Sequence, residues 1–166
     1  SIVGESREHC IVIGGLEING KKEDDVTVQD LTLRESKGSG ICGFNGASVH
    51  LDNLSVENSG SFGVVVSRTK RNSMKNCNVS HSKYSGLVVY HGGSMTIDGN
   101  ATTIHHNCVS GYGGYGLYAD GSSSSIFLVS PLTKEMISTN NGGSLIGCFK
   151  SRNFKGTINT IKTTTL

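Results

Sequence analysis

The sequence predicts an all-β solenoid, in which short parallel strands stack in successive coils. A unit of the chain repeats: residues 49–63 (VHLDNLSVENSGSFG) align with residues 26–40 and with residues 72–86 at a constant shift of 23 residues. Apolar residues alternate within the unit, as at Leu54 and Val56, and this is the period of a strand with one buried face. Gly, Asn, Asp and Ser separate the apolar runs, as expected for turns. Self-similarity at a period of roughly 20 to 50 residues is typical of repeat architectures.

The composition agrees with a thin stack of strands and turns. The chain has 166 residues with 23 Gly and 1 Pro, and 35% of its residues are apolar. Its length predicts a single domain, residues 1–166. The net charge of +2 is too small for a general attraction to nucleic acid or to a membrane surface. No apolar run approaches the roughly 20 residues that span a bilayer, so no membrane span is predicted.

A repeated spacing marks each coil: an apolar residue is followed seven positions later by Gly or Ser, and a short apolar strand comes directly after that Gly or Ser. Together with one earlier apolar run, at residues 11–13, this spacing predicts about six coils. The predicted strands are Ile11–Ile13, Ile41–Gly43, Val64–Val66, Leu87–Val89, Leu117–Ala119 and Leu145–Gly147.

The same spacing predicts columns of residues that lie above one another in successive coils. One inward column is Val28, Leu51, Met74 and Ile104, with Leu132 as the next rung; another is Leu33, Val56, Val79, Val109 and Ile137. A polar corner column is Asp30, Asn53, Asn76 and His106. Leu31, Leu54 and Cys77 form a third inward column, followed by Asn107. A buried Asn at that place requires hydrogen-bond partners. The register weakens at residues 134–136, which we interpret as an insertion.

Two segments carry a resemblance to a known family. They are residues 53–59 (NLSVENS) followed by Gly63-Val64, and residues 76–80 (NCNVS) followed by Gly86-Leu87. From about Cys10 to Ile161 the chain resembles right-handed parallel β-helix proteins with the pectate-lyase-like repeat. The resemblance implies a right-handed parallel β-helix. Because this scaffold carries lyases, hydrolases, epimerases, phage tail spikes and non-catalytic adhesins, it does not by itself imply an activity.

An outward column offers candidate catalytic residues. Enzymes of this family that act on acidic polysaccharides place acids and a base on the outer face of one sheet. The equivalent column here is Gln29, Asp52, Lys75 and His105. In an enzyme, Asp52 would bind a cation, Lys75 would act as base and His105 as acid. The paired-aspartate and Gly-His-Gly motifs of related hydrolases are missing, and a surface ion pair beside an exposed His explains the column more simply. A lyase, epimerase or glycoside hydrolase is therefore the alternative hypothesis. No metal site and no cofactor are predicted.

A second outward column is apolar and favours a docking function. The middle residues of the six short strands should point outward, and two neighbours extend them. The resulting stripe is Val12, Cys42, Val65, Val88, Tyr118 and Ile146, with Phe44 and Tyr90 beside it. An apolar stripe of this length is typical of an interaction surface. We therefore predict a non-catalytic structural or recognition module that docks a protein partner, another copy or a glycan. Alternatively, residues 112–115 fold over the stripe.

The remaining signals concern the compartment and the ends of the chain. The five Cys residues fit neither a zinc site nor a disulfide scaffold, so mostly free thiols are expected. Asn53, Asn78 and Asn100 open glycosylation sequons, which favours an extracellular or cell-surface location while leaving the compartment open. The chain begins without Met, and residues 156–161 read as the start of another coil. We therefore expect a processed piece or a fragment of a longer chain.

Overall fold

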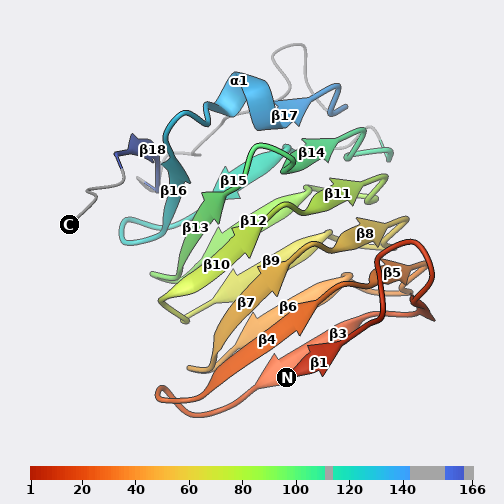
Figure 1. The fold of residues 1–166 in the computed structure, drawn as a ribbon. Coiled ribbons are helices and arrows are strands. Elements are labelled where there is room, and N and C mark those ends of the chain that lie inside the picture. The colour runs from red at the N-terminus through yellow and green to blue at the C-terminus, as the bar shows by residue number, and fades with distance from the viewer. Residues whose placement is uncertain (111–113, 143–155, 163–166) are drawn as a thin grey trace.

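The computed structural model describes residues 1–110, 114–142 and 156–162, which form a three-sheet parallel β-solenoid of about five turns. Figure 1 shows the coils stacked in chain order, with the N-terminus at one end of the stack. Sheet A consists of β1 (Ile2–Val3), β4 (Asp25–Gln29), β7 (Ser48–Asp52), β10 (Asn72–Lys75), β13 (Ser94–Asp98), β16 (Ser125–Val129) and β18 (Thr157–Ile161). Sheet B consists of β2 (Ile11–Ile13), β5 (Thr32–Arg34), β8 (Ser55–Glu57), β11 (Asn78–Ser80), β14 (Thr103–His105) and β17 (Ser138–Thr139). Sheet C consists of β3 (Leu16–Asn19), β6 (Ile41–Phe44), β9 (Val64–Ser67), β12 (Leu87–Tyr90) and β15 (Leu117–Ala119).

Inward-facing apolar columns form the core, and the 23-residue spacing is confirmed for the central coils. Leu33, Val56 and Val79 pair in register along sheet B, and each is at most 1% exposed. Leu87 pairs with Val64 on one side and with Leu117 on the other, as predicted. Burying such continuous apolar columns is the main stabilising contribution that a thin solenoid has.

The predicted columns are wrong at the coil that contains residues 94–119. Ile97 pairs with Met74 in sheet A, whereas Ile104 pairs with Val79 in sheet B. Val109 is therefore not an inward residue, and its side chain is 62% exposed.

The reason is where the longer coil holds its additional residues. Partners in sheet A are 23 residues apart, as at Lys75 and Asp98, but partners in sheet B are 25 apart, as at Ser80 and His105. Partners in sheet C are 30 apart, as at Leu87 and Leu117. The longer coil thus keeps the regular register through sheet A and adds residues at the next two corners.

Two further predictions in the last coils are corrected. Leu128, rather than Leu132, follows Ile97 in sheet A, although Leu132 is buried in the same core. Ser138, rather than Ile137, pairs with Ile104. The insertion expected at residues 134–136 is the short helix α1 (Lys134–Ile137), which Thr133 caps by accepting a hydrogen bond from the Met136 backbone N–H. Residues 145–147 lie outside the described residues.

Polar residues with positive φ form the corners. Asp30, Asn53 and Asn76 have φ of 57°, 50° and 50° after the sheet A strands, and Gly99 continues this column in place of His106. His106 belongs to the corner after sheet B, with His81 one coil earlier. Asn and Gly tolerate this backbone conformation better than most residues, which explains their recurrence.

Asn107 lies inside the solenoid, in a different column from the one predicted. Thr102 takes the place after Cys77, whereas Asn107 aligns with Ser82 and Asn141 of the neighbouring coils. Its side chain accepts a hydrogen bond from the Ser82 backbone N–H and donates to the Val79 carbonyl oxygen and to Asn141 Oδ1. The expectation that this buried Asn finds partners is confirmed.

A glycine column explains the Gly of the repeat. Gly40, Gly63 and Gly86 precede the strands of sheet C and are buried. A Cβ atom at Gly63 would lie 2.6 Å from the Gly86 carbonyl oxygen and nearer still to a methyl group of Val79. The close approach between neighbouring coils therefore requires glycine. In the described ranges no helix has the length and apolarity of a membrane span.

Candidate functional site

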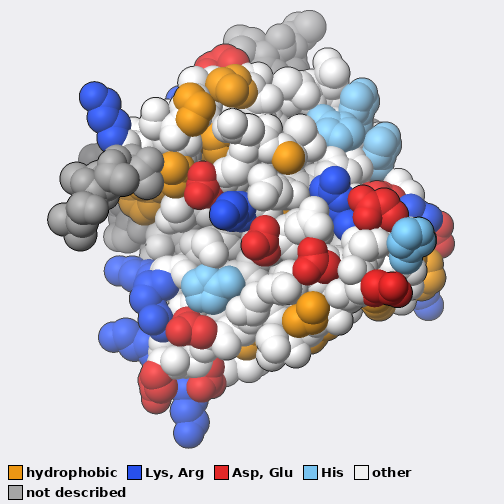
Figure 2. Space-filling view, in the orientation of Figure 1, with side chains coloured by type: hydrophobic (Ala, Val, Ile, Leu, Met, Phe, Trp, Pro, Cys, Tyr) orange, Lys and Arg blue, Asp and Glu red, His pale blue; other side chains and the backbone are white. Residues whose placement is uncertain are grey.

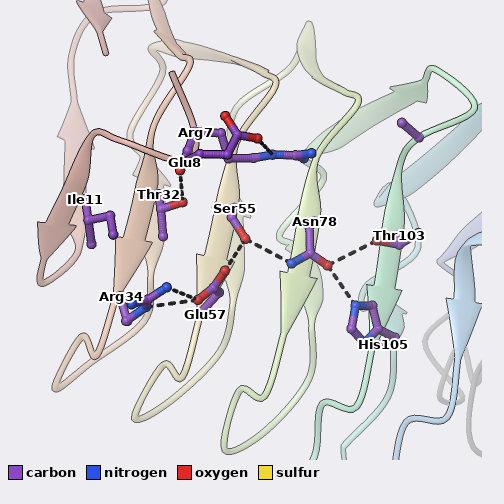
Figure 3. A pocket seen from close by; sticks show the side chains of 11 residues that line it. Arg7, Glu8, Ile11, Thr32, Arg34, Ser55, Glu57, Asn78, Thr103 and His105 are labelled. Carbon is purple, nitrogen blue, oxygen red and sulfur yellow. Dashed lines mark hydrogen bonds and ion pairs between the residues drawn. The ribbon is translucent and has the colours of Figure 1, made fainter. Parts of the chain in front are cut away.

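A polar groove lies on the outer face of sheet B, with a volume of about 470 Å³. We call it the sheet B groove; Figure 3 shows that its floor consists of outward side chains from successive coils. Two rows run along the solenoid axis because alternate residues of each strand point outward. The first row is Ile11, Thr32, Ser55, Asn78 and Thr103, and the second includes Arg34, Glu57 and His105.

The floor of the groove is one continuous hydrogen-bonded chain (Figure 3). Ser55 Oγ donates to Glu57 Oε1 at 2.6 Å, and Asn78 Nδ2 donates to Ser55 Oγ at 2.9 Å. Thr103 Oγ1 donates to Asn78 Oδ1 at 3.1 Å, and His105 Nε2 lies 2.8 Å from the same oxygen. Since that oxygen only accepts, His105 carries its proton on Nε2.

Charged side chains occupy one end of the groove. Arg34 donates to Glu57 Oε2 through Nε at 3.0 Å and through Nη2 at 2.9 Å. Both carboxylate oxygens of Glu57 thus accept hydrogen bonds. The segment before β2 crosses the groove, because Thr32 Oγ1 donates to the Arg7 carbonyl oxygen at 2.6 Å and Arg7 Nη1 reaches the Asn76 carbonyl oxygen at 3.4 Å. The groove therefore offers paired polar groups rather than an unpaired acid beside an unpaired base.

Three histidines meet at the other end. The Nδ1 atoms of His105 and His106 are 2.7 Å apart, and the His81 ring stacks on His106 with centroids 5.5 Å apart. Burial lowers the pKa of His105, and the neighbouring His106 and His81 lower it further. Within the described ranges, no group of three or more His, Cys, Asp or Glu side chains is arranged to hold a metal ion.

The candidate catalytic residues are not all brought together. Asp52 and Lys75 pair in sheet A as predicted, but the next residue of their column is Asp98. His105 lies in sheet B, one solenoid face away. The prediction of a contiguous Asp52, Lys75 and His105 strip is wrong, because the longer coil adds its residues after sheet A and not before it.

The residues of the predicted stripe pair in the expected order in the central coils, but the predicted order is wrong at the N-terminal end. Cys42, Val65, Val88 and Tyr118 pair in order along sheet C. Val12 lies in sheet B beside Leu33, and Glu17 takes its place beside Cys42. Ile146 lies outside the described residues. Phe44 and Tyr90 are both in sheet C but are separated by Ser67.

Aromatic rings lie on sheet C and at the corner that precedes its strands. The expectation that Val65 and Val88 form an exposed apolar surface is wrong, because they are 4% and 0% exposed. Five half-buried rings instead form a continuous series of contacts: Phe62–Tyr84, Phe62–Tyr90, Tyr90–Tyr118 and Tyr118–Tyr115, with centroids 5.6, 6.4, 6.0 and 5.3 Å apart. We call these five residues the aromatic face. Burial, followed by the Asp120 carboxylate, raises the pKa of the Tyr90 hydroxyl.

A family profile described as "right handed beta helix region" matches residues 14–165. This chain belongs to the right-handed β-helix family. Comparisons with curated proteins and with solved structures found no match. Family membership fixes the architecture of this β-helix, including its parallel sheets, and leaves its ligand to be inferred from the outer faces.

Sequence reasoning missed the sheet B groove of this β-helix, although part of its signal was present. Arg34 and Glu57 are 23 residues apart, in the region where the repeat is regular. Reading outward columns on sheet B would have found this ion pair. Arg7 could not be found in the same way, because it precedes the first repeat. Cys10, Cys42 and Cys77 are free thiols, as expected, whereas Cys148 lies outside the described residues.

Proposed function

We propose that this β-helix is a non-catalytic recognition module that binds a linear, uncharged glycan along the aromatic face of sheet C. The observation that carries the proposal is a series of five rings in which each contacts the next, with two rings on sheet C and three at the corner before it. Tyrosine combines a large apolar ring with a hydroxyl group, and such residues are enriched at recognition surfaces.

A glycan matches this surface chemically. One face of a pyranose ring presents C–H groups, which are attracted to the negative face of an aromatic ring. Tyr90 and Tyr118 lie on adjacent coils, and neighbouring strands are about 4.8 Å apart. The centroids of these two rings are 6.0 Å apart and their planes are nearly perpendicular, at 86°. A chain of linked sugar rings that runs along the solenoid axis therefore meets the face of one tyrosine and the edge of the next.

Polar groups beside the rings supply hydrogen bonds for sugar hydroxyls. Asp120 directly follows β15 and lies beside the end of β12, where its backbone N–H donates to the Val89 carbonyl oxygen. His91 follows Tyr90, and its Nδ1 lies 3.0 Å from Ser67 Oγ. Aromatic stacking combined with a few polar groups at the rim is the usual pattern of small-ligand sites.

The enzymatic alternative has less support from the geometry. His105 is on a different sheet from Asp52 and Lys75. In the sheet B groove, both oxygens of Glu57 are engaged by Ser55 and Arg34. Acid–base catalysis needs an acid and a base within reach of the same substrate bond.

Tyrosine fluorescence provides the test, because the chain has no Trp and four of its 5 Tyr belong to the aromatic face. We expect a β-1,4-linked glucose hexasaccharide to change this fluorescence saturably. Tyr90→Ala and Tyr118→Ala should each weaken binding by about three- to tenfold, the range expected for one aromatic contact. Phe127→Ala, an aromatic truncation on the outer face of sheet A, is the matched control and should bind like the wild type.

Three results would overturn the proposal. The first is binding that both tyrosine variants leave unchanged. The second is a dimer that Tyr118→Ala dissociates, which would make a second copy the occupant. The third is turnover of a galacturonate hexasaccharide that Lys75→Ala abolishes, which would support the enzymatic alternative.

A further inference from the structure

Basic side chains from two coils, with a glycine of the coil between them, meet at the corner between sheet C and sheet A. They surround a pocket of about 350 Å³, which we call the corner pocket. Its lining is Lys22, Gly46, Arg68, Lys70 and Arg71. Lys22 follows β3, Gly46 follows β6, and the other three lie between β9 and β10. Figure 2 shows Lys and Arg side chains gathered at this edge of the molecule.

The charge of the corner pocket is concentrated. Four cationic side chains line it, although the whole chain has a net charge of only +2. Asp25 offsets one of these charges, because its Oδ1 lies 3.3 Å from Arg71 Nη2 and 3.4 Å from His50 Nε2, and the lining keeps a net positive charge. A concave site lined by charges of one sign focuses the electrostatic potential and attracts a counter-ion.

Hydrogen bonds to the backbone hold the Arg71 side chain and the segment that carries Lys70. Arg71 Nη2 donates to the Lys22 carbonyl oxygen at 3.2 Å, which links two coils across the pocket. Ser48 Oγ donates to the Lys70 carbonyl oxygen at 2.9 Å. Gly46 packs on the backbone of Lys21 and Lys22, where a Cβ would lie 3.0 Å from the Lys22 nitrogen, so the lining is close-packed there.

Arg68 is an unusual residue for its backbone position. Its φ is 60°, and the aligned corner residues of neighbouring coils are Asn45, His91 and Gly121. Asn, His and Gly are the residue types enriched in this left-handed conformation, whereas Arg is not. Arg71 has φ of 63°. Two arginines thus adopt a conformation that disfavours them, and both line the corner pocket.

We propose that the corner pocket binds a multiply charged oxyanion, of the sulfate or phosphate type, carried by a larger ligand. Guanidinium groups donate paired hydrogen bonds to such oxyanions, and the Lys ammonium groups add charge. This site is separate from the aromatic face, and its test does not depend on whether a neutral glycan binds there.

The experiment is calorimetric titration with inorganic sulfate and inorganic phosphate at low ionic strength. We expect saturable binding that weakens as sodium chloride is added. Arg68→Asn and Arg71→Gln should each weaken it about tenfold or more, because each removes a charge-assisted hydrogen-bond donor. Lys37→Gln, an exposed cation at another corner, is the control for net charge and should bind like the wild type.

Arg68→Asn also separates binding from folding. Because Asn tolerates positive φ, as Asn45 does at the aligned position, this variant should melt at or above the wild-type temperature while it loses the oxyanion. Equal losses in Arg68→Asn and Lys37→Gln would overturn the proposal, since general charge attraction would then explain the binding. Unchanged affinity in both arginine variants would also overturn it. A sulfated disaccharide and a sugar phosphate, titrated in parallel, distinguish the two sources of the oxyanion.

Discussion

His105 shows how a single residue links the sheet B groove to the pH of the solution. Its Nε2–H donates to Asn78 Oδ1, and its Nδ1 faces the Nδ1 of His106 at 2.7 Å. A neutral His105 ring accepts at Nδ1, so His106 donates there. Burial of the ring disfavours the protonated form of His105, and the neighbouring His106 and His81 disfavour it further, which lowers its pKa.

The lowered pKa of His105 predicts a loss of stability in acid. The unfolded chain, with an ordinary His pKa near about 6.5, takes up the proton before the folded chain does. The neutral His105 ring therefore contributes its full stabilisation above the pKa of the unfolded chain. This contribution is lost as the pH falls from there to the lower pKa of the folded state. His105→Gln retains an amide donor toward Asn78 and has no titrating ring. Its free energy of unfolding in urea should fall less between pH 7.5 and pH 5 than that of the wild type.

Titrating groups remote from His105 act equally in both proteins, so the difference between the two pH profiles reports His105 together with its coupling to His106 and His81. Parallel profiles for His105→Gln and the wild type would show that the histidine contact has no energetic consequence. A steeper profile in the variant would reverse the assigned direction of the pKa shift.

At the scale of the strands and corners, the sequence predicted the central coils because their spacing is constant. Val56 and Val79 pair as expected, since every strand between residues 26 and 89 keeps the 23-residue shift. The spacing then rises to 30 residues in sheet C, and the apolar pattern does not reveal which corner holds the addition. Ile97 and Ile104 are equally apolar, so either could continue the Met74 column. For the same reason, the sequence predicted Ile11–Ile13 as the strand that stacks on Ile41–Gly43. In the structure β3 (Leu16–Asn19) occupies that place in sheet C.

Truncation of two residues in the longer coil tests the corrected register. Ile97 is 0% exposed beside Met74, so Ile97→Ala should lower the free energy of unfolding by about 2–5 kcal/mol through lost burial and the remaining cavity. Val109 is 62% exposed, so Val109→Ala should change it by no more than about 0.5 kcal/mol. Chemical denaturation of both variants measures the two values. A large loss for Val109→Ala would support the uncorrected column instead.

At the scale of the whole molecule, stability depends on contacts between neighbouring coils, and outward faces are free to vary. This explains why the fold could be predicted while the candidate sites could be only partly predicted. The inward columns carry a hydrophobic signal in every coil. Outward residues such as Arg34, Arg68 and Tyr118 are constrained only by what they contact, and those contacts depend on a register that the sequence fixes only in the regular region.

Asn107 tests this picture of neighbouring coils. It is 1% exposed and forms hydrogen bonds to Ser82 in the preceding coil and to Asn141 in the following one. Asn107→Ala leaves buried partners unsatisfied, so we expect it to destabilise the protein by at least about 2 kcal/mol. Asn100→Ala, at an exposed position of the same coil, is the control.

Because interactions in a solenoid are mostly between adjacent coils, hydrogen exchange of Asn107→Ala should show lost protection in β14 and in the backbone around Asn141, whereas β5 and β8 should keep their protection. Equal loss of protection in β5 and β14 would mean that the whole stack unfolds as one cooperative unit. Stability would then not depend mainly on contacts between adjacent coils.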